Sequence, residues 1–359
     1  MTVSLVHDYL TQRGGAERVV LALARAFPGA RLHTSLYDPA ATFPEFQAVD
    51  VRPALLNHVE LLRRNHRLAL PALAPVFSTL RVDADVAVCS SSGWAHGARV
   101  TGRKIVYCHT PARWLYQHRR YLRGRGVVVR GAAGALRSSL VRWDKAAARS
   151  AHCYLANSSM VAQRIADAYG IEADILPPPP AVTPEGEIES VAEVEPGFAL
   201  CVSRLLPYKN VDVLVRGFAA LPEERLVVAG SGPDERALRT LAPPNVTFVG
   251  RVSDAQLRWL YASCDLLVAA SYEDFGLTPL EAATFGKPAV VLRWGGFIDT
   301  VREGETGLFF EVPEEATVAA TVREARAHAW RSSAITSHAD GFAEPRFIER
   351  IRAIVGAAA

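Results

Sequence analysis

The sequence predicts an α/β protein with two Rossmann-like, doubly wound parallel-sheet domains, and three observations support this fold class. Short apolar runs of strand length alternate with segments of helical periodicity along most of the chain. Several of these runs end in small polar residues, as strands do at the ligand-binding edge of an open sheet. A stretch rich in Pro and Glu, residues 177–197, interrupts the alternation and divides the chain in two.

The same alternation gives the expected elements. The first half has expected helices at 15–27 and 159–170 and strands at 3–9, 30–37, 84–91, 104–110 and 153–159. The second half has expected helices at 211–221, 233–242, 253–264 and 278–286 and strands at 198–204, 225–232, 246–252, 265–271 and 287–292. The tail, about 314–355, is helical in composition, with an interruption expected near 332–344.

The composition is that of a folded protein, with 50% apolar and 21% charged residues. No apolar run is long enough for a membrane-spanning helix, and the N-terminus lacks a secretory pattern, so we expect a cytoplasmic protein. The five cysteines form no C-x-x-C pair and are expected to be buried and reduced. The single Asp-x-Asp pair, Asp83 and Asp85, opens a strand instead of ending one, so we expect no metal site.

Charge is distributed unevenly along the chain. Residues 1–180 hold 23 Lys and Arg against 12 Asp and Glu, whereas the remainder holds 17 against 25. The tract Arg113–Arg149 contributes nine arginines and one lysine against one aspartate, interleaved with apolar and aromatic residues. Such a tract can lie on an anionic membrane surface or form a solvated basic helix face. Nucleic acid is not expected as a partner, because no recognised binding motif accompanies the charge.

Three turns after expected strands carry glycines or cations. Gly14 and Gly15 stand between a strand and a helix, where free helix N–H groups could bind phosphate. Arg204 and Lys209 flank another such loop and could neutralise a diphosphate. A Gly-Ser-Gly turn, residues 230–232, ends a third strand. Each of these features could instead be a tight turn or a pair of solvated charges.

Two glutamates, Glu273 and Glu281, stand eight positions apart around an expected strand–loop–helix transition. Paired carboxylates can perform acid–base or nucleophilic chemistry. Thr278 is expected to cap the helix, and Glu281 would then complete a capping box three residues later. His109 closes a strand in the basic half, where a histidine can be either structural or functional.

Taken together and in this order, five stretches resemble the retaining nucleotide-sugar glycosyltransferases of family 4, which have the GT-B fold. They are RGGAERVV (13–20), SRLLPYKN (203–210), AGSGPDERAL (229–238), NVTFVGRVSDAQLRWLYASCDLLVAAS (245–271) and EDFGLTPLEAATFGKPAVV (273–291). The last contains the E-x7-E signature of that family. HDYLTQRGGAERVV, SSSGWAHG and YCHTPARWLY are also similar to bacterial GDP-mannose-dependent mannosyltransferases of O-antigen assembly.

The resemblance implies two domains facing a central cleft. An acceptor-binding domain spans residues 1–176, a linker 177–197 and a nucleotide-sugar domain 198–335, and a C-terminal helix in 336–359 returns to the first domain. It also implies roles for the matching residues. Arg204 and Lys209 would contact the donor diphosphate with the Gly14–Gly15 loop, Glu281 would bind the ribose, and Glu273 would hold the sugar. The remaining implied donor-site residues are Gly230, Gly232, Arg251, Val252, Phe275, Gly276 and Leu277.

His109 would lie over the reaction centre, so the implied catalytic set is His109, Arg204, Lys209 and Glu273. The implied reaction is retaining transfer of a hexose, mannose from GDP-mannose, to a lipid-linked or membrane-associated glycan, without a metal or cofactor. Alternatives are transfer from a UDP- or dTDP-sugar to a soluble acceptor, a nucleotide-sugar epimerase or hydrolase of this fold, and a non-catalytic nucleotide-sugar-binding protein.

Overall fold

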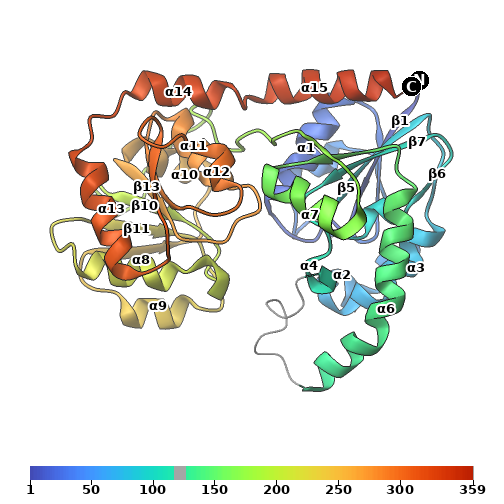
Figure 1. The fold of residues 1–359 in the computed structure, drawn as a ribbon, viewed down its shortest axis with the longest axis horizontal. Helices are drawn as coiled ribbons and strands as arrows, with labels where there is room; N and C mark the ends of the chain where they lie inside the picture. Colours follow the sequence, from blue (N-terminus) through green and yellow to red (C-terminus); the bar gives the residue numbers. More distant parts are fainter. Residues whose placement is uncertain (117–126, 359) are drawn as a thin grey trace. The chain divides into compact units, whose positions relative to one another are not determined.

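The computed structural model describes residues 1–116 and 127–358. It forms two compact units, Met1–Pro178 with Glu344–Ala359, and Pro179–Ala343. Each unit contains a parallel β-sheet with helices on both faces (Figure 1). The predicted class, two doubly wound parallel-sheet domains, is therefore confirmed.

The first unit is built on a seven-stranded parallel sheet in the order β3-β2-β1-β5-β7-β8-β9. Its strands are β1 (Val3–His7), β2 (Arg31–Thr34), β3 (Val51–Pro53), β5 (Val86–Ser91), β7 (Arg103–Cys108), β8 (Cys153–Ala156) and β9 (Asp174–Ile175). A two-stranded sheet pairs β4 (Arg81–Val82) with β6 (Arg99–Val100). Strand order reverses between β1 and β5, which is the switch point where open α/β sheets bind ligands.

Helices cover both faces of this sheet, and the faces alternate along each strand. Leu5 packs in a cluster with α1 and α15, whereas Val6 packs in one with α3, α6 and α7. The helices are α1 (Gly15–Ala26), α2 (Glu60–Arg64), α3 (His66–Thr79), α4 (Arg113–Tyr116), α6 (Val127–Arg149), α7 (Ser159–Tyr169) and α15 (Glu344–Ala357). Arg25 of α1 also pairs with Glu344 of α15, at 2.9 Å between Nη2 and Oε2.

The second unit is built on a six-stranded parallel sheet in the order β12-β11-β10-β13-β14-β15. Its strands are β10 (Ala199–Val202), β11 (Leu226–Ala229), β12 (Val246–Gly250), β13 (Leu266–Ala269), β14 (Ala289–Leu292) and β15 (Gly307–Phe310). Its helices are α8 (Val211–Ala219), α9 (Glu235–Leu241), α10 (Asp254–Ser263), α11 (Leu277–Thr284), α12 (Phe297–Thr300), α13 (Glu315–Ala327) and α14 (Ser332–Asp340). Strand order here reverses between β10 and β13.

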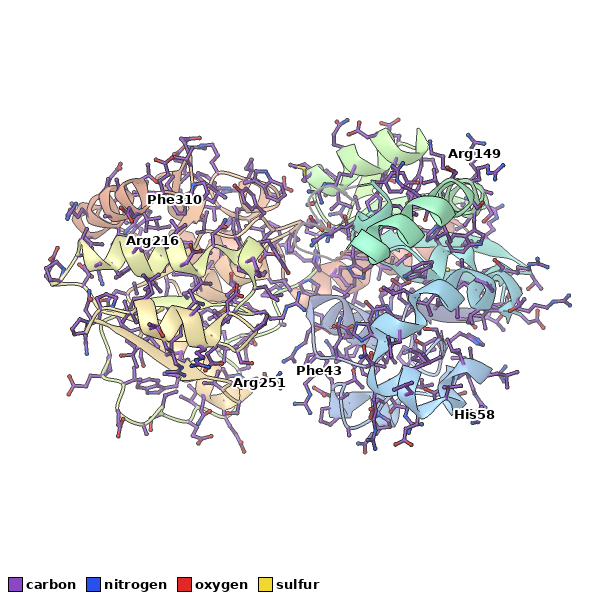
Figure 2. The ribbon with its side chains drawn as sticks, turned by 90° about the horizontal axis from the view of Figure 1, so that it is seen from below. Phe43, His58, Arg149, Arg216, Arg251 and Phe310 are labelled. Atoms are coloured by element: carbon purple, nitrogen blue, oxygen red, sulfur yellow. The ribbon has the colours of Figure 1, made fainter. Side chains whose placement is uncertain are left out.

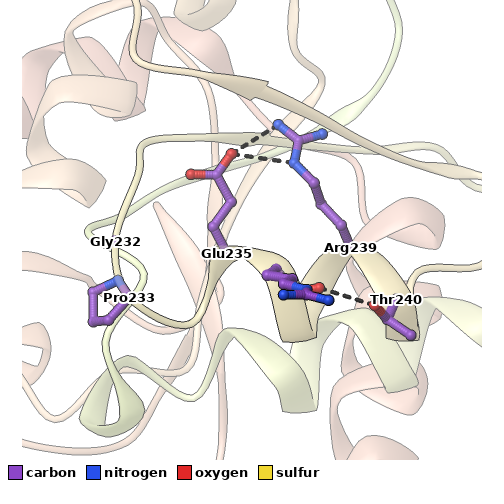
Figure 3. A pocket seen from close by; sticks show the side chains of 6 residues that line it. Gly232, Pro233, Glu235, Arg239 and Thr240 are labelled. Atoms are coloured by element: carbon purple, nitrogen blue, oxygen red, sulfur yellow. Dashed lines mark hydrogen bonds and ion pairs between the residues drawn. The ribbon is translucent and has the colours of Figure 1, made fainter.

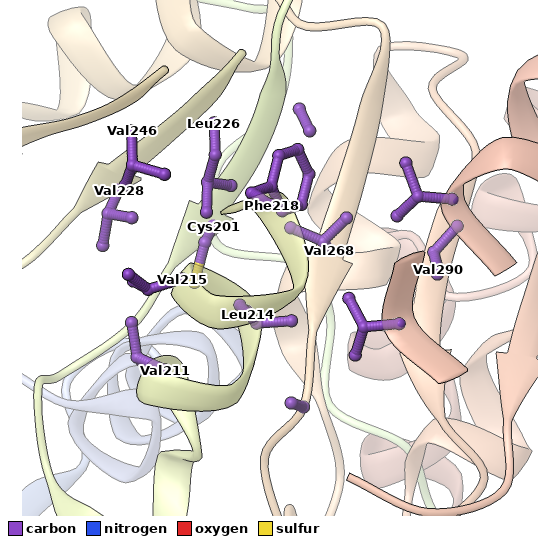
Figure 4. Close-up of a cluster of buried hydrophobic side chains, with 14 of the residues drawn as sticks. Cys201, Val211, Leu214, Val215, Phe218, Leu226, Val228, Val246, Val268 and Val290 are labelled. Carbon is purple, nitrogen blue, oxygen red and sulfur yellow. The ribbon is translucent and has the colours of Figure 1, made fainter. Parts of the chain in front are cut away.

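One face of the second sheet packs on α8 and α13 (Figure 4). Leu214 and Phe218 of α8 are buried against Cys201, Val228 and Val268 of three neighbouring strands. Phe310, labelled in Figure 2, ends β15 in the same cluster. Because parallel strands buried on both faces need nearly continuous apolar runs, the runs read from the sequence correspond to these strands.

The chain tail differs from the expectation. The expected interruption near 332–344 contains helix α14, and the helical breaks lie at 328–331 and 341–343. The unit boundary falls at Ala343/Glu344, so α14 belongs to the second unit and only α15 to the first. Residues 179–197, expected as a linker, are grouped with the second unit. Val182 of this segment is 2% exposed and packs in a core cluster of the second unit. A composition rich in Pro and Glu could not predict this burial.

Candidate functional site

In the second unit, the predicted cation and carboxylate meet at the switch point of the sheet. Lys209 lies in the turn η4 (Pro207–Lys209) after β10, and Glu273 lies in the loop after β13. The Lys209 ammonium forms an ion pair with Glu273 Oε1, which also accepts a hydrogen bond of 3.1 Å from Ser271 Oγ. The Glu273 carboxylate is therefore oriented by two donors at the sheet edge where ligands bind.

The loop that carries both predicted cations is tied to β13. Asn210 adopts a left-handed conformation, with φ of 50°, and its Nδ2 donates to Ala270 O at 2.8 Å. Tyr272 N donates to Tyr208 O at 3.3 Å. Arg204 is exposed and its Nη2 donates to the Tyr208 hydroxyl at 3.2 Å. Lys209 is thus fixed near Glu273, whereas Arg204 presents an exposed guanidinium.

The glycines after β11 have a packing reason. A Cβ at Gly230, where φ is 133°, would lie 1.9 Å from Ser203 O, and one at Gly232 would lie 2.2 Å from Leu205 O. Only glycine allows the cation loop to approach this closely. Arg251, labelled in Figure 2, donates from Nε to Ser231 Oγ at 2.8 Å, and Val252 packs in the adjacent core cluster.

The loop after β13 also needs glycines that the sequence did not single out. A Cβ at Gly295 would lie 2.1 Å from Glu273 O, and one at Gly296 would lie 2.2 Å from Phe275 Cα. Gly296 N donates to Glu273 O at 3.1 Å. The side chain of Glu273 thus projects from a backbone that the segment after β14 holds in place.

The predicted capping box is wrong. Helix α11 begins at Leu277 with Gly276 as N-cap, at φ of 87°, and no side chain caps it. Thr278 is therefore already inside the helix, and Glu281 is buried and accepts a 2.7 Å hydrogen bond from the Tyr261 hydroxyl. Burial raises the pKa of Tyr261, and the charge of Glu281 adds to it, so the phenol stays a donor. The sequence missed this partner, because Tyr261 lies on α10 within an apolar segment.

A hollow of about 590 Å³ opens beside the glycine turn and is lined by Gly232, Pro233, Glu235, Arg236, Arg239 and Thr240 (Figure 3). Arg239 and Glu235 pair across one side of it at 2.9 Å. It shares only Gly232 with the predicted donor residues, and neither Lys209 nor Glu273 lines it. We therefore do not assign the sugar to this hollow.

In the first unit, polar side chains also gather at the switch point. His7 ends β1, Ser90 lies near the end of β5, and His109 directly follows β7. His7 Nδ1 lies 3.0 Å from Ser90 Oγ and 3.1 Å from Ser90 O, and Ser90 Oγ lies 2.8 Å from His109 Nε2. All three side chains are buried. The sequence identified only His109, because the contacts of His7 and Ser90 depend on the register between strands, which the sequence does not show.

The glycine turn before α1 encloses a carboxylate. Glu17, 1% exposed, places Oε1 3.9 Å from His7 Nε2, and a Cβ at Gly14 would lie 2.7 Å from Glu17 Oε2. Oε2 is buried without a hydrogen-bond partner among the described residues. The absence of a side chain at Gly14 thus makes room for Glu17, and Gly15 is the first residue of α1.

Burial sets the titration of both histidines. It lowers the pKa of His109 to about 3, with a further contribution from the charge of His7. Burial also lowers the pKa of His7, but contact with the negative Glu17 and Asp8 outweighs it, so the pKa of His7 is raised. The array therefore combines a neutral imidazole at His109 with a His7 ring that favours the proton.

Asp8 holds the segment after β5. Its carboxylate accepts hydrogen bonds from the amides of Ser92 at 2.7 Å, Trp94 at 3.2 Å and Ala95 at 2.6 Å. Burial raises the pKa of Asp8, although His7 and these amides act in the opposite direction. The segment SSSGWAHG is thus held by an aspartate that directly follows the neighbouring strand, β1.

Several remaining predictions concern partners. Within residues 1–116 and 127–358, no group of three His, Cys, Asp or Glu side chains could hold a metal, and no helix could cross a bilayer. Asp85 accepts from the Thr2 amide at 2.6 Å, and Asp83 from Thr101 Oγ1 at 3.0 Å. The basic tract Arg113–Arg149 lies partly outside the described residues; its described part comprises α4 and α6.

Comparisons with known proteins agree with this architecture. Residues 13–183 match the family described as Glycosyltransferase Family 4, and residues 185–329 match Glycosyl transferases group 1. D-inositol 3-phosphate glycosyltransferase of Mycobacterium sp. (strain KMS) is 38% identical over 120 residues, 30% of this chain and 27% of the relative. Mannosylfructose-phosphate synthase of Agrobacterium fabrum is 35% identical over 128 residues, 31% and 28% of the two chains. The match thus spans less than a third of either relative's length.

Solved structures share the whole fold at low identity. Anabaena Alr3699/HepE, crystallised with UDP-glucose, has a TM-score of 0.72 and 18% identity, covering 99% of this chain and 100% of that one. Sucrose-phosphate synthase from Thermosynechococcus elongatus has a TM-score of 0.74 and 18% identity, covering both chains fully. The first part of the chain therefore matches glycosyltransferase family 4, the second part matches glycosyl transferases group 1, and the whole chain has the GT-B fold.

Proposed function

We propose that this glycosyltransferase moves a hexose from a nucleotide diphosphate sugar to an acceptor hydroxyl with retention of configuration and without a metal. The pairing of Lys209 with Glu273 at the switch point of the second sheet carries the proposal. A fixed cation at this edge stabilises the charge that develops on a leaving diphosphate, the task a metal performs elsewhere. Arg204, exposed on the same loop, adds a second charge.

In the proposed reaction the bond between the anomeric carbon and the β-phosphate oxygen breaks while the acceptor oxygen bonds to that carbon from the same face. The acceptor proton passes to an oxygen of the departing phosphate. Glu273 is engaged by Lys209 and Ser271, so its carboxylate suits holding sugar hydroxyls better than acting as a nucleophile. We assign it to the sugar.

We assign Glu281 to the ribose. Tyr261 donates to Oε2 of this carboxylate and orients it, and an ionised carboxylate can accept several hydrogen bonds, including those of ribose hydroxyls. For the donor we favour GDP-mannose on the resemblance in residues 7–20, 90–97 and 107–116. The name of the Agrobacterium relative is consistent with mannosyl transfer, and UDP- and dTDP-sugars are the alternatives.

For the acceptor we propose a glycan at an anionic membrane surface. Leu55 and Leu61 are 86% and 66% exposed, close in sequence to Arg63 and Arg64, and this apolar and basic surface suits a lipid headgroup layer. The Arg113–Arg149 tract adds further cations. The inositol phosphate in the name of the mycobacterial relatives favours a soluble phosphorylated acceptor as the second candidate.

A thermal-shift screen of GDP-, UDP- and dTDP-sugars, in EDTA, tests the donor. A ligand at 100 times its Kd stabilises the folded protein by about 2.7 kcal/mol, so one donor should raise Tm clearly. Lys209→Met should reduce this stabilisation to about 1.4 kcal/mol or less, and Arg216→Ala, which removes an exposed cation of α8, should retain it in full. No shift with any nucleotide sugar would contradict the proposal. Product formed without an acceptor would favour the epimerase or hydrolase.

Flotation with anionic liposomes at low salt tests the membrane. The wild type should float with the vesicles. The double variant Leu55→Asp/Leu61→Asp should remain in the bottom fraction and keep the Tm of the wild type. Failure of the wild type to bind would leave the soluble acceptor as the better candidate.

A further inference from the structure

The hydrogen bonds around Ser90 have a fixed direction because one member can only accept. His7 Nδ1 lies 3.1 Å from Ser90 O, a backbone carbonyl, so Nδ1 of His7 must carry a proton. The same proton points toward Ser90 Oγ at 3.0 Å, which makes that hydroxyl oxygen an acceptor. Among the described residues, the one remaining hydrogen-bond partner of the Ser90 hydroxyl is His109 Nε2, at 2.8 Å, so we direct the hydroxyl proton to it.

This direction determines the form of His109. A ring nitrogen that accepts a hydrogen bond is unprotonated, so the single proton of neutral His109 must lie on Nδ1. None of the described residues hydrogen-bonds to that Nδ1. His109 thus presents an N–H donor on the ring edge away from Ser90.

The other end of the array favours the protonated form of His7. Glu17 Oε1 faces His7 Nε2 at 3.9 Å, and the buried Glu17 is itself held by Gln12 Nε2 at 3.0 Å. Asp8, the next residue of the chain, also faces His7, while its carboxylate is engaged by three amides. Burial disfavours a positive charge on His109, and a proton on His7 beside Ser90 adds to this effect.

We propose that Glu17, His7 and Ser90 form a positioning array that holds the proton of His109 on Nδ1, so that His109 serves a substrate of the first unit as a hydrogen-bond donor and not as an acid or base. The assignment to a substrate rests on the proposed function, whereas the tautomer does not. Glu17, His7 and Ser90 are positioning residues; only His109 would touch substrate.

Long-range ¹⁵N–¹H NMR on the full-length, histidine-labelled protein tests the tautomer, with His109 identified by its loss in His109→Gln. We expect a protonated Nδ1 and an unprotonated Nε2 from pH 6 to 8. Ser90→Ala should give a mixture of tautomers. Ser91→Ala is the matched control, because that buried neighbour bonds to His96 Nδ1 at 3.0 Å instead. An Nε2–H form in the wild type, or no change in Ser90→Ala, would overturn the proposal.

Two substitutions at His7 separate the hydrogen bond from simple packing. His7→Asn keeps an N–H near the position of Nδ1, so it should retain the His109 tautomer, and His7→Leu should lose it. With a donor and acceptor in hand, His7→Leu should lower kcat about tenfold with little change in the donor KM, and His7→Asn should restore most of it. Equal spectra of His7→Asn and His7→Leu would overturn the proposed role of the array. If the wild type transferred no sugar, only the proposed function would be refuted.

Discussion

Both units place polar residues at the switch point of their sheet, but the residues at the two switch points differ in kind. At the β10/β13 switch point a lysine and a glutamate pair, with an arginine exposed on the same loop. At the β1/β5 switch point the polar groups are buried histidines, a serine and a glutamate. The first arrangement can neutralise an anionic leaving group, whereas the second can fix one hydrogen-bond donor. The shared topology therefore supports two tasks, charge stabilisation and orientation.

Lys209→Ala should have the largest effect on the reaction. It removes the cation at the second switch point and deprives Glu273 of its ion pair, so kcat should fall about 10³-fold. Steady-state kinetics measure this, with Arg216→Ala as the control. A kcat of Lys209→Ala within tenfold of the wild-type value would contradict a role of this region in charge stabilisation.

Gly230→Ala comes next and tests whether the second region depends on backbone approach. The substituted residue would keep φ at 133° and meet Ser203 O, so the free energy of unfolding should fall by about 3 kcal/mol. Gly14→Ala, where only the end of the Glu17 side chain obstructs, should cost less than about 1 kcal/mol. Urea denaturation compares the two, and equal losses would contradict the distinction.

The first region should show itself in the pH dependence of stability. The pKa of His109 is lowered to about 3, so the unfolded chain takes up a proton below pH 6.5 that the folded chain refuses. Stability is fully present above pH 6.5 and falls by about 1.4 kcal/mol per unit below it, or about 2 kcal/mol at pH 5. His109→Gln should lack this component. Identical slopes in the wild type and variant between pH 6.5 and 5 would contradict the buried neutral histidine.

The pKa of His7 has the opposite sign. Because it is raised, its contribution is complete below pH 6.5 and is lost as the pH rises through the folded value. Acid and alkali should therefore weaken the same array through different histidines.

The smallest effect should come from Tyr261→Phe. Loss of the hydroxyl bond to Glu281 should weaken nucleotide binding about tenfold, the low end of what a hydrogen bond to a charged group contributes. A 2′,3′-dideoxy nucleotide should bind wild type and variant alike, because it lacks the ribose hydroxyls. If Tyr261→Phe weakened the binding of both nucleotides equally, Glu281 would have a structural role only.

The sequence was informative where a feature lies within one loop. The positions of Arg204, Lys209 and Glu273 in loops after strands could be predicted because each follows an apolar strand in a recognisable motif, and their roles stay predictions. His7, Ser90 and Tyr261 could not, since their partners lie on other strands or helices and depend on register. The prediction of a capping box was wrong because Gly276, and not Thr278, is the N-cap of α11. The predicted interruption near 332–344 was wrong because Ser332–Asp340 forms a helix.

Calorimetric titration of nucleoside diphosphates in EDTA is the decisive test of whether the second switch point is a metal-independent donor site. We expect that GDP, UDP or dTDP binds the wild type and that Lys209→Met binds it at least about tenfold more weakly, a loss of about 1.4 kcal/mol. Binding of none of the three, or equal binding by the wild type and Lys209→Met, would contradict a donor site at this point.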